Sequence, residues 1–147
     1  AKAVIGALLT FYWGGAMVGR FLGSGLMTRI APNRLLGTFA LLAAAMVVVS
    51  ISSSGILALV ALLAVGFFNS IMFPTIFTLA IDELGEMKPL GSGILCTAIV
   101  GGAVIPPAVG KLADLSGGFG WAFVLPALCY LYIQFYAFRV ARPSGVN

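Results

Sequence analysis

Five long apolar runs, separated by short polar connections, constrain this chain more than any other feature. They cover residues 3–27, 35–53, 56–81, 90–110 and 119–138. A helix needs about 20 mostly apolar residues to cross the hydrocarbon core of a bilayer. Lipid cannot satisfy an open backbone, and the runs lack the two-residue alternation of a membrane barrel. The sequence therefore predicts an all-α integral membrane protein with five transmembrane helices in one membrane domain, residues 1–147.

The composition excludes several other classes of protein. Only 8% of the residues are charged, whereas soluble domains carry about 25%, so we exclude a soluble enzyme. The net charge of +4 is thinly spread and forms no basic face for a nucleic acid. The chain has no histidine and no glycine-rich phosphate loop or cluster of metal-ligating side chains. We therefore expect no enzymatic activity, no metal and no cofactor.

The cations between the runs predict an orientation. Short connections force neighbouring helices to be antiparallel, so successive connections lie on alternate sides of the membrane. One side then holds Arg29, Arg34, Lys88, Arg139 and Arg142, and the other holds Lys2 and Lys111. Positively charged connections favour the cytoplasm, which places the C-terminus there. An odd number of spans leaves the N-terminus outside, or implies that a preceding helix is absent from this chain.

The first run carries a stripe of small residues and one arginine. Gly15, Gly19 and Gly23 recur every four residues, a spacing that lets another helix approach closely, although glycine is common in membrane helices generally. Arg20 is the cation within a span, and an intramembrane charge is costly. It either extends towards the interface and binds carbonyl or carboxylate groups, or takes part in gating or substrate contact.

The third run concentrates polar and aromatic side chains around a proline. Asn69, Ser70 and Thr75 supply hydrogen-bonding groups, and Phe73 supplies an aromatic face. Pro74 lacks a backbone donor, so it frees a carbonyl one turn earlier and bends the helix. An amide beside an aromatic ring suits a sugar, whose hydroxyls bond to the amide and whose CH face stacks on the ring. The alternative is a kinked packing helix whose asparagine bonds to a neighbouring helix.

Two other groups of residues complete the candidates. Tyr12 and Trp13 lie near the middle of their run, where they either anchor the helix at the interface or contact a cavity. Gly101 and Gly102, followed by Pro106, predict a kinked span that can bend during gating. Glycine and proline also occur in static helix bundles.

Several stretches together resemble one family of transporters. They read VGRFLGSGLMTRIAPNRLL, FFNSIMFPTIFTLAIDELG, GSGILCTAIVGGAVIPPAVGKLAD and LPALCYLYIQFYAFR. In combination they resemble the major facilitator superfamily, and within it the fucose–galactose–glucose:proton symporters, over residues 11–139. A member of this family has twelve helices in two halves of six. The resemblance places this chain at helices eight to twelve, part of the C-terminal half, with the preceding helix and the N-terminal half absent.

The resemblance also assigns roles to the candidates. The third run would be the tenth helix, which lines the sugar cavity, and the first and fourth runs would pack against the other half. Arg29 lies in a degenerate copy of the superfamily's loop signature, where Thr28 stands in place of an aspartate, which argues against charge-relay gating there. The substrate-binding candidates are Asn69, Ser70, Phe73, Pro74, Thr75, Tyr12 and Trp13. The gating and packing candidates are Gly15, Gly19, Arg20, Gly23, Arg29, Gly101, Gly102 and Pro106.

The function implied by the resemblance is secondary active transport of a hexose across the bacterial cytoplasmic (inner) membrane. The energy source would be a proton or cation gradient. The expected partners are a small sugar, the lipid bilayer and the N-terminal half of the same transporter, without nucleic acid. Two alternatives are a porter for another small polar solute and a non-transporting membrane subunit that pairs through its glycine stripe.

Overall fold

The computed structural model describes residues 2–140, and within them every element is helical. The prediction of an all-α protein is confirmed. Arg142, one of the cations used to predict the orientation, lies outside the described residues. The elements in chain order are α1 (Lys2–Met27), α2 (Pro32–Ser52), α3 (Gly55–Asn69), α4 (Met72–Ile81), the 3₁₀ segment η1 (Asp82–Met87), α5 (Lys88–Ala98), α6 (Gly101–Ser116), α7 (Phe119–Ala122), α8 (Val124–Phe135) and the π-helical turn η2 (Tyr136–Val140).

Four helical stretches among the described residues are long and apolar enough to cross a membrane: Pro32–Ser52, Gly55–Ile81, Leu84–Ser116 and Gly120–Arg139. Three of them are interrupted, since each joins more than one helix of the chain. α1 matches their length with 26 residues.

Proline and glycine set the ends of several helices. Pro32 occupies the first turn of α2, where a missing backbone N–H costs nothing. α6 ends at Ser116 and is capped by Gly117, whose φ of 70° lies in the left-handed region that a side chain makes costly. The N–H of Gly118 then bonds to the carbonyl of Ala113 at 3.0 Å. This C-cap turns the chain towards α7.

Two of the long stretches are broken between consecutive helices. α3 ends at Asn69 and α4 begins at Met72, so the chain is not α-helical at Ser70 and Ile71, just before Pro74. α5 likewise ends before Ile99, and α6 resumes at Gly101 with Pro106 inside it. The third expected span, 56–81, and the fourth, 90–110, are therefore each bent rather than continuous.

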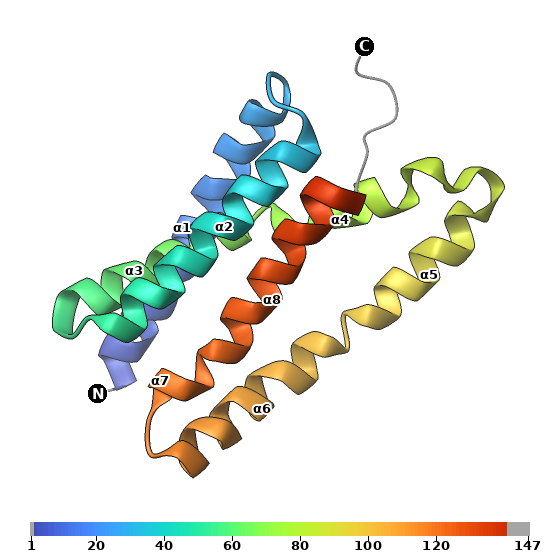
Figure 1. Ribbon diagram of the computed structural model, residues 1–147. Helices are drawn as coiled ribbons and strands as arrows, with labels where there is room; N and C mark the ends of the chain where they lie inside the picture. Colours follow the sequence, from blue (N-terminus) through green and yellow to red (C-terminus); the bar gives the residue numbers. More distant parts are fainter. Residues whose placement is uncertain (1, 141–147) are drawn as a thin grey trace.

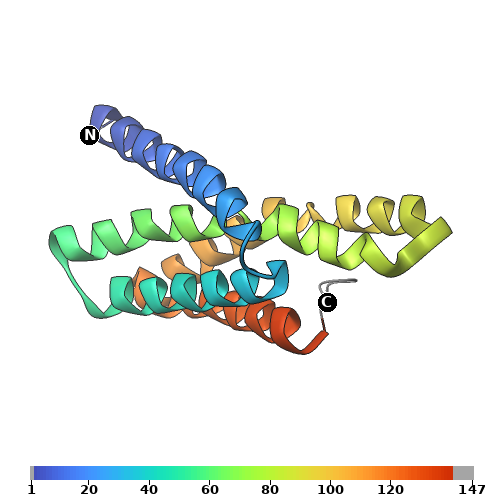
Figure 2. The ribbon, with the colours of Figure 1, turned by 90° about the horizontal axis from the view of Figure 1, so that it is seen from above.

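The hydrophobic core lies around α2, which runs beside α3 and α8 (Figure 1). The small and branched side chains of α2 allow α4 and the end of α8 to pack closely against it. The buried core residues are Leu35, Leu36, Phe39, Ala40, Ala43, Ile71, Met72 and Ala137. Figure 2 shows α1 crossing this group of helices at an angle, and its contacts are mainly with α3.

α5 and α6 form an arm that stands away from this core (Figure 1). No described residue of α5 is buried, and Ala113 is the buried residue of α6. Large apolar side chains along the arm are exposed, with Ile94 at 64% and Val104 at 58% of their accessible surface. The arm joins the rest of the molecule through η1 and α4 at one end and through α7 at the other.

The connections between helices fall into two groups at opposite ends of the molecule. Figure 1 shows the α1–α2 turn, η1 and the last described residues at one end, and the α2–α3 and α6–α7 connections at the other. Arg29, Arg34, Lys88 and Arg139 lie in or next to the segments at the first end, and Lys111 lies in the last two turns of α6, which leads to the second. The structure thus separates the described cations as the alternation of connections predicts.

Candidate functional site

A cleft of about 220 Å³ lies between α1 and the α3–α4 segment. Residues predicted from the sequence for two different roles, substrate binding and gating, line this one cleft. Its lining consists of Tyr12, Trp13, Ala16, Arg20, Gly66, Asn69, Ser70 and Phe73. The cleft therefore combines an amide, a cation, a hydroxyl and aromatic rings within one concave surface.

The aromatic rings of the cleft have open faces. Trp13 exposes 68% of its surface and Phe73 exposes 52%. Tyr12 and Trp13 meet edge to face, with ring centroids 5.8 Å apart. Asn69 is exposed beside them, so its amide is accessible to a polar group that stacks on a ring.

Gly66 positions the Tyr12 ring, and sequence reasoning missed it. A methyl group on Gly66 would lie 2.6 Å from Cε2 of Tyr12, so the ring occupies the space that a larger residue would fill. The signal was present in the sequence: Gly66 and Ser70 are small residues four apart, the same spacing as the stripe on α1.

Arg20 binds the backbone at the break between α3 and α4. Its Nε and Nη2 atoms donate to the carbonyl oxygen of Ser70 at 3.4 and 3.3 Å. In a continuous helix that carbonyl would accept from the N–H of residue 74, which Pro74 lacks. Among the alternatives left open for Arg20, the described structure shows the carbonyl contact.

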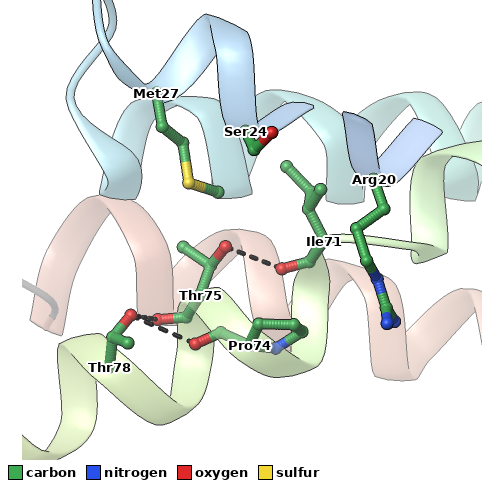
Figure 3. A pocket seen from close by; sticks show the side chains of 7 residues that line it. All are labelled: Arg20, Ser24, Met27, Ile71, Pro74, Thr75 and Thr78. Carbon is green, nitrogen blue, oxygen red and sulfur yellow. Dashed lines mark hydrogen bonds between the residues drawn. The ribbon is translucent and has the colours of Figure 1, made fainter. Parts of the chain in front are cut away.

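Pro74 and Thr75 lie in a second cleft, of about 200 Å³, on the other side of Arg20. Figure 3 shows Ser24 and Met27 of α1 above it and the α4 residues below. Thr75 is only 2% exposed and donates its hydroxyl to the carbonyl of Ile71 at 2.6 Å. Its hydrogen is thus used within its own helix, and Thr75 lies apart from the cleft that holds Asn69.

The glycine stripe of α1 contacts α3 and the following turn at two of its three positions. A methyl group on Gly19 would collide with the Phe67 carbonyl oxygen and lie 2.7 Å from Oγ of Ser70. One on Gly23 would collide with Ile71. Gly15 has no neighbour within 4 Å of such a methyl group. The close approach is therefore centred on Gly19 and Gly23, on either side of Arg20.

The remaining gating candidates lie away from the cleft. Arg29 is exposed in the turn after α1. Gly101, Gly102 and Pro106 lie on α6, and added methyl groups at the two glycines would meet nothing within 4 Å. The structure does not bring this group together with Arg20 or Asn69.

No protein-family model matches the chain, but individual proteins do. The chain is 48% identical over 128 residues to the glucose/galactose transporter of Brucella abortus, covering 87% of this chain and 31% of that protein. It is 35% identical over 147 residues to the L-fucose-proton symporter of Escherichia coli K12, covering 100% of this chain and 32% of the symporter.

A solved structure shares the fold. The crystal structure of the major facilitator superfamily transporter FucP in the outward conformation matches with a TM-score of 0.92 and 33% identity, over 98% of this chain and 34% of that one. The chain spans about a third of the length of the curated relatives it matches. The predicted family resemblance is confirmed, as is the predicted fold, part of a major facilitator transporter.

Proposed function

Because this chain is a homologue of bacterial sugar transporters and has the fold of the matching third of a major facilitator superfamily transporter, we propose that it transports a hexose. We infer that it does so as part of a longer transporter. In such transporters a midplane site is exposed alternately to the two sides when two structural repeats rock against each other. The partner of this chain would be the N-terminal half of the same transporter.

The cleft between α1 and the α3–α4 segment is the observation that carries the proposal. A hexose presents hydroxyl groups around its rim and an apolar CH face. Asn69 can both donate and accept hydrogen bonds with hydroxyls, while Trp13 and Phe73 offer aromatic faces for the CH surface. The printed names of the relatives, a glucose/galactose transporter and an L-fucose symporter, support a neutral sugar as the ligand.

We infer that the energy source is a proton or cation gradient and that no bound cofactor takes part. A relative of this chain is named a proton symporter, which supports protons as the coupling ion. The acidic residues of this chain are Asp82, Glu83, Glu86 and Asp114, at the ends of spans. The proposal therefore places the coupling carboxylates in the rest of the transporter.

We infer a multi-pass protein of the bacterial inner membrane, with its C-terminus in the cytoplasm. The α1–α2 turn, η1 and the last described residues lie at one end of the described structure (Figure 1), and Arg29, Arg34, Lys88 and Arg139 lie in or next to these segments. Lys111 lies in the last two turns of α6, which leads to the other end. An excess of cations marks the cytoplasmic side. A cysteine-labelling scan with a membrane-impermeant reagent would test this orientation, because only the outer connections of intact cells would react.

Sugar uptake in transporter-deficient cells tests the proposed function. This 147-residue chain would be compared with the same chain extended by the coding sequence that precedes it in the genome. We expect uptake of labelled glucose or galactose only in the extended protein, and loss of that uptake when a protonophore collapses the gradient. Uptake by the chain alone would contradict the need for a second half. If neither the chain alone nor the extended protein takes up the sugar although both insert normally into the membrane, hexose transport would be contradicted.

Asn69→Ala tests whether the cleft is the sugar site. We expect sugar affinity to fall about tenfold, near the upper end for loss of one hydrogen bond. Gln134→Ala is the matched control, because it removes an amide from α8, which contributes nothing to the lining of this cleft. Unchanged affinity for Asn69→Ala would remove this residue from the site. Equal losses in both variants would indicate a general effect on folding.

A further inference from the structure

We propose that Arg20 is a positioning residue that fixes the bend between α3 and α4 and so holds the two walls of the cleft together. One wall, on α1, carries Tyr12 and Trp13, and the other carries Asn69 and Phe73. The role in sugar binding rests on the proposed function. The role in fixing the bend rests on the backbone contacts alone.

The hydrogen bonds of the backbone show why the bend needs an outside donor. At the end of α3, the N–H and hydroxyl of Ser70 both donate to the carbonyl of Phe67, at 3.4 and 2.7 Å. The helical pattern resumes when the N–H of Thr75 donates to Ile71 at 3.1 Å. Between these bonds the carbonyl of Ser70 lacks its helical donor, because that donor would be Pro74. Within a bilayer an unsatisfied carbonyl is costly.

Arg20 reaches this carbonyl because small residues flank it on α1. Gly19 and Gly23 bring the α1 backbone against Phe67, Ser70 and Ile71, with no room for a methyl group at either glycine. The guanidinium then directs two N–H groups, on Nε and Nη2, to one oxygen. The rigid fork of arginine suits such a contact better than the single ammonium of lysine.

The same side chain forms part of both clefts beside the bend. Arg20 lines the cleft of about 220 Å³ with Asn69 and Phe73. It also lines the cleft of about 200 Å³ with Pro74 and Thr75, shown in Figure 3. Because its Nε and Nη2 donors are directed to the Ser70 carbonyl, we infer that Arg20 influences a ligand through the spacing of the cleft walls. This distinguishes it from an arginine that binds the sugar directly.

A double-mutant cycle in the full-length transporter tests the proposal. The variants are Arg20→Met, Pro74→Ala and the pair together, with Arg34→Met as a control for losing an exposed arginine. An alanine at position 74 restores the N–H that can satisfy Ser70 within the helix. We expect Arg20→Met to raise the KM for sugar about tenfold, with kcat less affected, as for one unsatisfied hydrogen-bonding group. In the Pro74→Ala background the same substitution should raise KM less than about threefold, since the two sites are coupled.

The apparent melting temperature of the purified protein provides a second readout that needs no sugar. We expect Arg20→Met to lower it in the native background and to change it little in the Pro74→Ala background, while Arg34→Met changes it in neither. If Arg20→Met fails to fold, recovery of folded protein by adding Pro74→Ala supports the proposal. No recovery overturns it.

The two proposals fail in different ways. If Arg20→Met raises KM equally in both backgrounds, Arg20 acts on the sugar without the bend, and the positioning role is overturned. If the native protein transports no hexose, the proposed function fails, but the coupling between positions 20 and 74 in melting temperature still decides whether Arg20 fixes the bend.

Discussion

Gly19→Ala is the sharpest single test of how α1 packs. The added methyl group would collide with the Phe67 carbonyl oxygen, lie 2.7 Å from Oγ of Ser70 and lie 3.1 Å from Cδ2 of Phe67. The first of these neighbours is a backbone atom, which cannot swing aside as a side chain can. Gly25→Ala is the matched control, because it lies on the same helix and its methyl group would meet nothing within 4 Å.

Comparison with Gly25→Ala isolates the effect of packing on the free energy of unfolding. Alanine favours a helix over glycine by about 1 kcal/mol, and this gain is common to both substitutions. Overpacking costs about 1–3 kcal/mol and applies only at Gly19. We therefore expect the free energy of unfolding of Gly19→Ala to lie about 1–3 kcal/mol below that of Gly25→Ala.

Thermal unfolding of the purified full-length transporter, followed by the loss of monodisperse protein, measures this difference. We expect Gly19→Ala to melt at a lower temperature than the native protein and Gly25→Ala to melt at the same temperature or higher. A bulkier Gly19→Leu should lower the yield of folded protein further. If Gly19→Ala and Gly25→Ala melt together, α1 does not approach α3 closely in the membrane, and the packing argument is refuted.

Three further outcomes follow from the described contacts. Trp13→Ala should weaken sugar binding several-fold through loss of an aromatic face, whereas Trp121→Ala, which removes an even more exposed ring from α7, should not; equal effects in a binding titration would exclude stacking on Trp13. Gly117→Ala should destabilise the protein by about 1–2 kcal/mol because of its left-handed φ, and Gly118→Ala, measured in the same melt, should not. Thr75→Val should leave sugar affinity within about twofold, because the hydroxyl already bonds to its own helix; a tenfold loss in the titration would place this hydroxyl on the sugar.

Local chemistry made part of the structure predictable. Pro74 removes one backbone donor wherever the chain folds, so a freed carbonyl and a bend followed from the sequence alone. The identity of the group that satisfies this carbonyl did not, because Arg20 is 50 positions away along the chain and several partners were chemically equivalent. The contact needed the close approach of α1, which depends on what Gly19 and Gly23 face.

Faces of helices were harder to predict than helices. In a bilayer, apolar side chains are suited to lipid and to protein alike, so hydropathy does not say which side of a span is packed. The glycine stripe predicted a close contact but not that Gly15 would lie outside it. Likewise the sequence grouped Thr75 with Asn69, although a spacing of six residues leaves them about a third of a turn apart around a helix and the bend at Ser70 and Ile71 lies between them.

The bends at residues 70–71 and 99–100 differ in stiffness. The bend at Ser70 and Ile71 is held by packing, because Ile71 and Met72 belong to the core. Any change in the angle between α3 and α4 must therefore move close-packed side chains. At Ile99 and Val100 the chain bends with no buried residue on α5, and both residues are exposed. The arm can therefore flex at its middle, between α5 and α6, without moving packed side chains of α5, while the α3–α4 bend behaves as a fixed corner that keeps the shape of the cleft.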